Sequence, residues 1–459
     1  MFPAVEQAGF ASSLDFDDIP EQVREAAKRS LLDILGVAIH GRAHPVAKSG
    51  LAGARSLSEG EGRSVVWGSG EMLQLGAAII ANGISAHVDD FDDTHSDGIV
   101  HGSAVIAPLA VGLAAACGAS GKELLAAYVA GWEIAARVGL ASKGTFHKRG
   151  FHTTSIAGVF GATAAACRLL RLTSEQTAHA LGLAASQASG INEYLSNGSS
   201  AKTLHCGWSA YAGLVAARMA HGGMTGPQSV FEGRDGLLRA YGLPEFCNPA
   251  ALTRDLGTKW QMSEVSIKPY PCCHFAHAFV DCAASLMARG VTADQIEGIE
   301  CVVHELQAPM ICEPRSDKLT PANPYIAKFS LPYLVAARMV QGRPTSHETF
   351  SDSNLARSDI LSLARRVTHR IAAPGETRFP QTFPGKLTAT LHDGTRIEER
   401  LDANLGHPEN PLSFEDIVAK FRSNASDVLN PSGVDQVVNL VRAIEATDAR
   451  TLAESLGAH

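Results

Sequence analysis

Acidic side chains crowd together in one short segment of the chain, AHVDDFDDTHSDGIVHGSAVIAP at residues 86–108. Four aspartates fall within five residues of this segment: Asp89, Asp90, Asp92 and Asp93. On a helix, Asp89 and Asp93 would share one face, and like charges at that spacing destabilise a helix by about 0.2–0.5 kcal/mol. Because apolar residues flank the segment on both sides, a solvated helix end explains it less well than a functional site.

One chemistry open to such a cluster is metal binding. The run DDFDD matches the DDxxD pattern of helical enzymes that bind magnesium and prenyl diphosphates, and magnesium prefers carboxylate ligands. Those enzymes also need aromatic pocket walls and a second acidic motif. Aromatic residues make up only 6% of this chain and no second motif occurs, so we expect no metal in the site.

The other chemistry is acid–base catalysis beside a carboxylate. Removing a proton from the carbon next to a carboxylate creates a doubly charged enediolate, which needs a base and nearby cations or hydrogen-bond donors. Side chains of those types occur along the chain: His101, His152, Lys202, Lys268 and His277. The protein could therefore stabilise such an intermediate with its own side chains.

Helices are expected to carry most of these residues. Apolar side chains recur at helical spacing in these stretches: 18–40, 71–88, 104–117, 122–139, 155–170, 174–189, 205–221 and 227–232. Most of the stretches are rich in Ala and Gly, which let helices approach closely, so the first 250 residues are predicted to form a helical bundle. His152 precedes a predicted helix, whose N-terminus favours anions, and Lys202 is expected in a turn of small residues.

The pattern changes near residue 263. Lys268 and Tyr270 each precede a proline and are expected to be extended, and a helix is predicted at about 274–288. Alternation typical of strands appears at 296–306, 365–372 and 386–401, the last with a hairpin signal at Asp393-Gly394. Helical patterns return at 413–426 and 433–446.

These patterns together predict a mainly α protein with two domains. A large all-α helical domain is expected to comprise residues 1–262 and 402–459. A smaller α+β domain, residues 263–401, is expected to be inserted in it as a lid. We expect the site in the cleft between the two domains, a common place for ligands.

Bulk composition limits the partners and the compartment. The chain has 459 residues, too many for a single core, and its 45% hydrophobic and 19% charged residues are typical of globular proteins. A net charge of -8 without a basic run argues against nucleic-acid binding. The N-terminus lacks signal-peptide features, and the most apolar stretch, 104–116, is too short to span a bilayer. Nine irregularly spaced cysteines argue against disulfides, so we expect a cytoplasmic protein without a membrane partner.

Five separated motifs resemble those of the MmgE/PrpD family and occur in the family's order. They are DDFDDTH with the following His-Gly-Ser at 89–103, GFHTTSIAGVFGATAAA at 150–166, SSAKTLHCGWSA at 199–210, IKPYPCCHFAHAF at 267–279 and AKFSLPY at 327–333. The predicted opening helix, IPEQVREAAKRSLLDILGVAIHG at 19–41, is also similar. Each motif alone is weak evidence, whereas five in order form a specific signal.

The resemblance implies a cofactor-independent, homodimeric enzyme for small di- or tricarboxylic acids. By their matches to the family's motifs, the implied catalytic residues are His101, Asp90, His152 and Lys268, and the implied substrate-binding residues are Thr94, Lys202, His277 and Tyr333. His101 is the implied base, although one extra residue separates it from Thr94. Lys202 and Lys268 are expected to reach substrate carboxylates from different domains when the lid closes.

We expect a lyase, either a dehydratase or a decarboxylase. An epimerase of an amino- or iminodicarboxylate, such as iminodisuccinate, is the alternative, because these reactions share the formation of a carbanion or its equivalent. A helical scaffold without catalytic activity stays a further alternative. Gly102 stands where the family usually has proline, which argues against 2-methylcitrate dehydratase itself. Each site residue also has a structural alternative: a packed or capping role for the histidines, a solvated surface for the lysines and packing for Tyr333.

Overall fold

The chain folds into two compact units, here called the large unit and the small unit. The structure is a computed structural model and describes residues 1–342, 345–379 and 382–457. The large unit comprises residues 1–267 and 413–459, and the small unit comprises residues 268–412. Both observed boundaries, 267/268 and 412/413, fall later in the chain than the predicted domain boundaries, 262/263 and 401/402. Residues 402–412 stay with the small unit, where the main-chain nitrogen of Leu405 donates to the carboxylate of Asp281.

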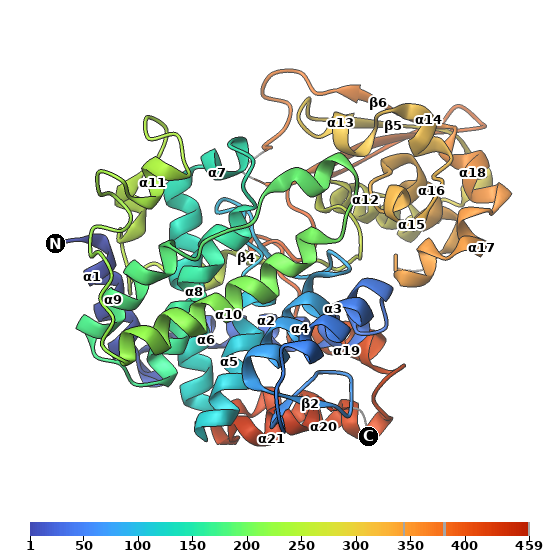
Figure 1. The fold of residues 1–459 in the computed structure, drawn as a ribbon. Coiled ribbons are helices and arrows are strands. Elements are labelled where there is room, and N and C mark those ends of the chain that lie inside the picture. Colours follow the sequence, from blue (N-terminus) through green and yellow to red (C-terminus); the bar gives the residue numbers. More distant parts are fainter. Residues whose placement is uncertain (343–344, 380–381, 458–459) are drawn as a thin grey trace. The chain divides into compact units, whose positions relative to one another are not determined.

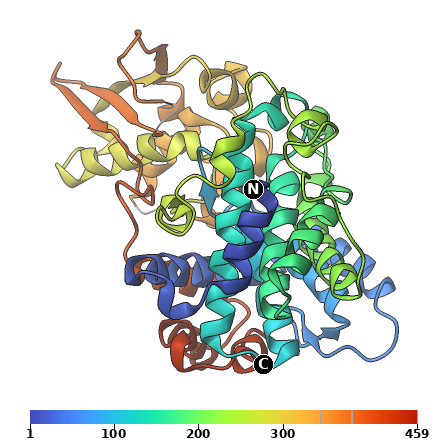
Figure 2. The same cartoon turned by 90° about the vertical axis from the view of Figure 1, so that its left-hand side faces the viewer.

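Helices build the large unit (Figure 1). In chain order they are α1 (Pro3–Ser13), α2 (Glu21–Gly41), α3 (Pro45–Ser56), α4 (Leu75–His87), α5 (Ser103–Cys117), α6 (Gly121–Ser142), α7 (Thr145–Lys148), α8 (Thr153–Leu169), α9 (Ser174–Ala185), α10 (Ala201–His221), α11 (Leu237–Ala240), α19 (Phe414–Ala425), α20 (Pro431–Arg442) and α21 (Ala449–Ser455). α8 packs on α6, α5 and α10, and α10 packs on α4. In Figure 2, α1 in dark blue lies across this bundle, against α8 and α9.

Short elements join these helices. The 3-10 turns of the large unit are η1 (Phe16–Asp18), η2 (Asn192–Ser196), η3 (Pro249–Leu252), η4 (Gln261–Glu264) and η8 (Ile444–Ala446). Two-residue strands form two antiparallel pairs, β1 (Ser64–Val65) with β2 (Met72–Leu73) and β3 (Thr94–His95) with β4 (Val265–Ser266). The β3–β4 pair ties the end of the large unit's first segment to the loop that carries the aspartates.

Small residues let the helices of the large unit pack closely, as the sequence predicts. A Cβ added to Gly161 of α8 would lie 2.6 Å from the carbonyl oxygen of Gly131 in α6. A Cβ added to Gly207 of α10 would lie 2.4 Å from the carbonyl oxygen of Ile80 in α4. The backbones of these helix pairs therefore touch, which fixes the distance between the residues that the helices carry.

Helix α6 is long and apolar enough to span a membrane by length and composition, but 94% of its apolar window is buried inside the fold. Ser120 begins the helix with a capping box, in which its side chain accepts a hydrogen bond from the main chain of Glu123. A buried Glu133–Arg137 ion pair lies within the helix. These features are typical of a core helix.

Two local predictions for the large unit are wrong. Residues 227–232 do not form a helix, because a segment so short, which begins with Pro227 and is followed by Gly233, gains too few hydrogen bonds to nucleate. Lys202 does not lie in a turn, because α10 already begins at Ala201. The helix places Lys202 in a defined first turn.

The small unit combines a four-stranded sheet with short helices. Strand β5 (Ile296–Val303) pairs in parallel with β6 (Val367–Ile371) and antiparallel with β7 (Gly385–Leu391), which forms a hairpin with β8 (Arg396–Leu401). The strands lie where alternation predicts them. Its helices and 3-10 turns are η5 (His274–Ala276), α12 (His277–Ala288), η6 (Ala293–Gln295), α13 (Ala308–Ile311), α14 (Arg315–Leu319), α15 (Pro324–Lys328), α16 (Leu331–Gln341), η7 (His347–Phe350), α17 (Asp352–Leu355) and α18 (Ser358–Ala364).

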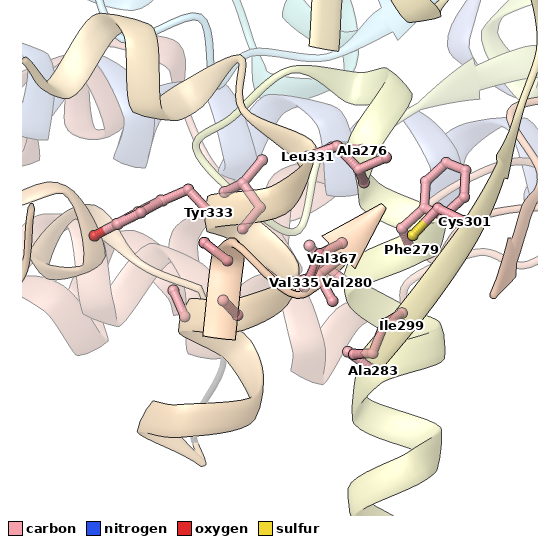
Figure 3. Close-up of a cluster of buried hydrophobic side chains, with 14 of the residues drawn as sticks. Ala276, Phe279, Val280, Ala283, Ile299, Cys301, Leu331, Tyr333, Val335 and Val367 are labelled. Atoms are coloured by element: carbon pink, nitrogen blue, oxygen red, sulfur yellow. The ribbon is translucent and has the colours of Figure 1, made fainter. Parts of the chain in front are cut away.

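The small unit has its own hydrophobic core (Figure 3). α12 packs on β7 and β8 and also contacts α16. Phe279 and Val280 of α12 meet Ile299 and Cys301 of β5 in this core, and Val335 comes from α16. The protein is therefore mainly α, with the strands of its principal sheet confined to the small unit.

Candidate active site

The aspartate cluster lies in the loop of residues 88–102, which links α4 to α5. Asp90 has a φ of 54°, a left-handed conformation that Asp tolerates better than most residues and that ends helical backbone. Asp89 and Asp93 therefore do not share a helix face, and the helical arrangement considered from the sequence is wrong. Thr94 pairs with strand β4, which fastens the loop within the large unit.

Asp92 lies between two histidines of this loop region. Its Oδ2 atom is 2.8 Å from the Nδ1 atom of His87 and 3.5 Å from the Nδ1 atom of His101. Asp92 and His87 are buried, whereas 16% of the His101 side chain is exposed. The carboxylate thus contacts both rings, and of the two histidines only His101 has surface that a substrate could contact.

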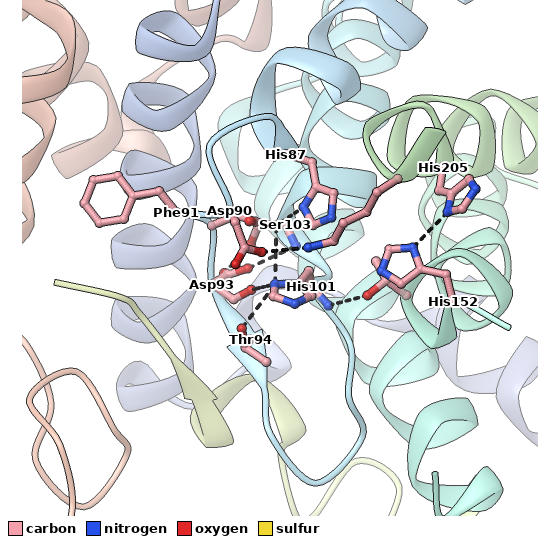
Figure 4. Close-up of polar contacts among 12 residues, drawn as sticks. His87, Asp90, Phe91, Asp93, Thr94, His101, Ser103, His152 and His205 are labelled. Carbon is pink, nitrogen blue, oxygen red and sulfur yellow. Dashed lines mark hydrogen bonds and ion pairs between the residues drawn. The ribbon is translucent and has the colours of Figure 1, made fainter. Parts of the chain in front are cut away.

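The orientation of His101 is set by its neighbours (Figure 4). Its Nδ1 atom lies 3.0 Å from the main-chain carbonyl oxygen of Asp93 and 3.2 Å from the hydroxyl of Thr94. A carbonyl oxygen can only accept, so Nδ1 carries the hydrogen. In the neutral ring the Nε2 atom then holds the lone pair, which is the arrangement that a general base needs.

The side chain of Asp93 points into the protein. It shares hydrogen bonds with the hydroxyl and the main-chain nitrogen of Ser103, and that hydroxyl also bonds to Tyr128 and to the indole of Trp132. Burial raises the pKa of Asp93 to about 8, with a smaller contribution from the charge of Asp33. Asp93 is therefore a structural, largely protonated acid, and its main-chain carbonyl is what serves the site.

Lys202 and Asp90 form an ion pair at the site. The Nζ atom of Lys202 lies 2.8 Å from Oδ1 of Asp90, and about a quarter of each side chain is exposed. Burial lowers the pKa of Lys202, but the charge and hydrogen bond of Asp90 outweigh burial, so the net shift is upward. Lys202 is consequently a permanent cation and cannot serve as the base.

His152 lies at the N-terminus of α8 and contacts His205 of α10. Their Nδ1 atoms are 3.1 Å apart (Figure 4). Burial, with the neighbouring His87 and Lys202, places the pKa of His152 well below its ordinary value, and the same causes lower the pKa of His205 to about 4. Both rings are therefore neutral near pH 7. The ring of His87 stacks on that of His152 at 5.7 Å between centroids, so the histidines form one cluster.

The buried side chain of Lys420 contacts the main chain of the aspartate loop. Lys420 of α19 lies 2.6 Å from a carboxylate oxygen of Asp33 and 3.1 Å from the main-chain oxygen of Phe91. It also sits 3.7 Å from the centroid of the Phe91 ring, a favourable cation–π arrangement. Burial raises the pKa of Asp33 to about 6 in spite of this partner. α19 thus positions the aspartate loop.

The small unit carries the other predicted site residues. Lys268 is only 2% exposed, and His277 is fully buried with its Nε2 atom 3.1 Å from the main-chain oxygen of Cys272. The alternative of a solvated surface lysine is therefore wrong for Lys268. A part in substrate binding stays a prediction for both residues.

Tyr333 is a packing residue and not a substrate contact. It is fully buried in the core of the small unit, and its hydroxyl donates to the main-chain oxygen of Thr349 at 2.7 Å (Figure 3). A side chain without exposed surface, whose only hydroxyl is already bonded, has nothing to offer a ligand. The predicted role of Tyr333 is wrong for this reason.

Metal ligation fits the site poorly. The potential donor atoms of His87, Asp92 and His101 lie within 4.8 Å of one another. The Nδ1 atom of His101 donates its hydrogen to the Asp93 carbonyl, so only its Nε2 atom keeps a lone pair that a metal ion could use. Asp92 and Asp93 are turned inward and fully buried, so the carboxylates do not face outward together, as the DDxxD alternative requires.

Comparison with known proteins decides the family. Residues 5–246 match the MmgE/PrpD N-terminal domain and residues 270–446 match the MmgE/PrpD C-terminal domain.

The chain belongs to the MmgE/PrpD family.

Its curated relatives include cis-aconitate decarboxylases from three organisms. The protein of Aspergillus terreus is 28% identical over 97% of this chain and 94% of its own length. The mouse protein is 28% identical over 95% of this chain and 90% of its own length. The human protein is 27% identical over 93% of this chain and 88% of its own length. The similarity therefore spans both units.

Family membership and geometry agree for the residues of the large unit. Five residues that match MmgE/PrpD motifs gather around the aspartate loop: Asp90, Thr94, His101, His152 and Lys202. Sequence reasoning assigned no individual role to His87, Asp92 and His205, whose contacts link these residues. The first two lie inside the unusual acidic segment and His205 lies in the Lys202 motif, but only the fold shows which histidine each one touches.

Proposed function

We propose that this MmgE/PrpD protein is a lyase that decarboxylates or dehydrates a small di- or tricarboxylic acid. We favour decarboxylation of cis-aconitate or of a similar unsaturated tricarboxylate, because relatives that align over nearly the whole chain are cis-aconitate decarboxylases. The observation that carries the proposal is the orientation of His101. Its Nδ1 hydrogen is held by the Asp93 carbonyl, so Nε2 is the atom that can exchange a proton with a substrate.

Decarboxylation of such an acid requires one proton transfer. The bond to the leaving carboxylate breaks, its electron pair forms a new carbon–carbon double bond, and the electrons of the old double bond move to the carbon beside a second carboxylate. That carbon takes a proton and carbon dioxide leaves. In our proposal the proton comes from Nε2 of His101, whose charged form is stabilised by Asp92 at 3.5 Å. Dehydration would begin with the same atom acting as base.

Two further residues would stabilise the charge that develops on the second carboxylate. Lys202 is a permanent cation, although it shares its charge with Asp90. His152 is neutral, so it would act as a hydrogen-bond donor and not as a charged acid, a role known for neutral imidazoles in proton-transfer enzymes. Neither residue needs a cofactor for this role.

The test is turnover of a panel of acids by the purified protein. The panel contains cis-aconitate, citrate, 2-methylcitrate and iminodisuccinate, and carbon dioxide and products are measured. Net turnover of cis-aconitate or a hydroxy acid, with kcat lowered about 10²–10⁴-fold in His101→Gln and unchanged in the exposed control His221→Gln, supports the proposal. Net turnover of none of the acids would overturn it, and racemisation of an iminodicarboxylate alone would favour an epimerase.

A further inference from the structure

We infer that His205 is a positioning residue that decides which ring nitrogen of His152 carries the hydrogen. The Nδ1 atoms of the two rings lie 3.1 Å apart, and no more than one of them can donate in such a bond when both rings are neutral. The tautomer of His152 is therefore set by its partner. The inference rests on the proposed function in one respect, because it assigns His152 the task of donating to a substrate.

The position of His152 favours one of the two tautomers. It is the N-cap of the 17-residue helix α8, where unpaired main-chain N–H groups create a positive potential. Nδ1 is the ring nitrogen nearest the backbone, so this potential favours a lone pair there. His205 then donates its Nδ1 hydrogen to His152, and His152 keeps its own hydrogen on Nε2, at the outer end of the ring.

The surroundings of His205 hold its ring in place. Gly190 has a φ of +113°, and a Cβ at that position would lie 3.2 Å from Cγ of His205. The ring of Tyr194 lies 5.9 Å away between centroids. Lys202 precedes His205 by one helical turn on α10, so one helix face presents both the cation and the positioning residue.

The chemical consequence is specific to an anionic substrate. An imidazole with hydrogen on Nε2 can donate to a carboxylate oxygen on which charge develops, whereas the other tautomer presents a lone pair that repels it. Losing the hydrogen bond from His205 leaves both tautomers of His152 accessible. We therefore expect the loss in kcat and not mainly in KM, because the donated hydrogen bond matters most in the charged transition state.

The test compares two substitutions of nearly the same shape, His205→Asn and His205→Asp, and a third, His205→Phe, that removes hydrogen bonding at this position. His205→Asn places an amide N–H where Nδ1 was, while His205→Asp offers only acceptors when ionised. We expect His205→Asn to keep kcat within a few-fold, and His205→Asp and His205→Phe to lose about 10-fold or more, roughly the effect of one neutral hydrogen bond. His221→Asn on the exposed end of the same helix is the control.

A second readout needs no turnover. Ring nitrogens with and without hydrogen differ in ¹⁵N chemical shift, and the His152 signals are identified by their loss in His152→Gln. We expect hydrogen on Nε2 of His152 in the wild type and in His205→Asn, and on Nδ1 in His205→Asp. The inference would be overturned if the Asn and Asp variants had equal kcat. It would also be overturned if the ¹⁵N chemical shifts of His152 were the same in the wild type and in every His205 variant. If the wild type turns over no acid, the proposed function fails and the ¹⁵N shifts alone decide the role of His205.

Discussion

Burial keeps Asp93 protonated at pH values where a free aspartate is ionised. Its pKa is raised to about 8, mainly by burial, from about 3.9 in an unfolded chain. Because the folded state binds the extra proton, the stability that Asp93 contributes is present below the unfolded pKa and is lost as pH rises towards 8. The loss is about 1.4 kcal/mol per pH unit in that window.

Asp93→Asn tests this at residue scale. An amide, like a protonated carboxyl group, offers both donor and acceptor atoms, so it can replace the hydrogen bonds to Ser103 without titrating. We predict a variant that folds, and whose stability relative to the wild type rises between pH 5 and pH 8. Urea unfolding at several pH values measures the difference. If the difference in unfolding free energy between the variant and the wild type does not change with pH, Asp93 is ionised in the folded protein.

Lys202→Met tests the cation of the site. The substitution removes the charge, keeps most of the side-chain volume and leaves Asp90 without the partner at 2.8 Å. We predict about 10–150-fold weaker binding of citrate, because a charge-assisted contact is worth about 1.5–3 kcal/mol. Calorimetric titration of the variant against the exposed control Lys48→Met measures this. Citrate affinity equal in the two variants would remove Lys202 from the site.

The residues of the site are only partly predictable from sequence. Residue type and motif spacing point to His101 and Lys202, because His commonly serves as a base and Lys as a cation and because their motifs are specific. The same reasoning misplaces Tyr333, since a motif does not show that the hydroxyl is used by Thr349. Asp92 and Asp93 are indistinguishable in sequence, yet one contacts histidines and the other is buried against Ser103.

At the scale of elements, the contact between α4 and α10 sets the geometry of the site. α4 leads into the aspartate loop and α10 carries Lys202 and His205, and the two backbones touch at Gly207. A Cβ there would lie 2.4 Å from the carbonyl oxygen of Ile80. α4 and α10 would have to separate to accommodate this Cβ atom, and the separation would move Lys202 away from Asp90.

Gly207→Ala should therefore destabilise the protein by about 1–3 kcal/mol, as overpacking does, and also lower kcat. Gly53→Ala is the matched control, because it lies in helix α3 and a Cβ there meets nothing within 4 Å. The control should be neutral or more stable by up to about 1 kcal/mol, since Ala favours helix over Gly. Equal unfolding free energies for the two variants would show that the helix contact can relax.

Sequence periodicity predicts the long elements well and the short ones poorly. Helices such as α6 and the hairpin β7–β8 are found because apolar spacing and the Asp393-Gly394 turn are local signals. The start of α4, predicted at residue 71, is not found, because Met72 and Leu73 pair as strand β2 before the helix begins at Leu75. The short helices of the small unit also escape prediction, since four or five residues carry too little periodicity.

At the scale of the whole molecule, the proposed function requires that the side chains of this mainly α protein carry out the chemistry themselves. We predict that activity survives dialysis against EDTA, because the aspartates already bond to histidines, Ser103 and Lys202, which a metal ion would have to displace. Activity before and after chelation, with magnesium or manganese added back, measures this. Loss on chelation and recovery with a metal would contradict it. Homodimer formation and a cytoplasmic location also stay predictions.

Lys268 extends the test to the small unit, where it is buried. If it binds substrate, Lys268→Met should weaken citrate binding by a factor similar to that of Lys202→Met. Thermal melting of the empty variant distinguishes a binding role from a packing role. Unchanged citrate affinity, or a variant that melts early and binds normally once folded, would confine the role of Lys268 to structure.

The most direct test of the central claim is deuterium incorporation during turnover of cis-aconitate in D₂O. We predict carbon dioxide release and a product with one deuterium at the carbon beside a carboxylate, delivered from Nε2 of His101. His101→Gln, folded by circular dichroism, should slow this incorporation about 10²–10⁴-fold. Product formed at a normal rate by His101→Gln, or deuterium exchange into the acids without any net turnover by the wild type, would contradict the proposed role of His101 in a lyase.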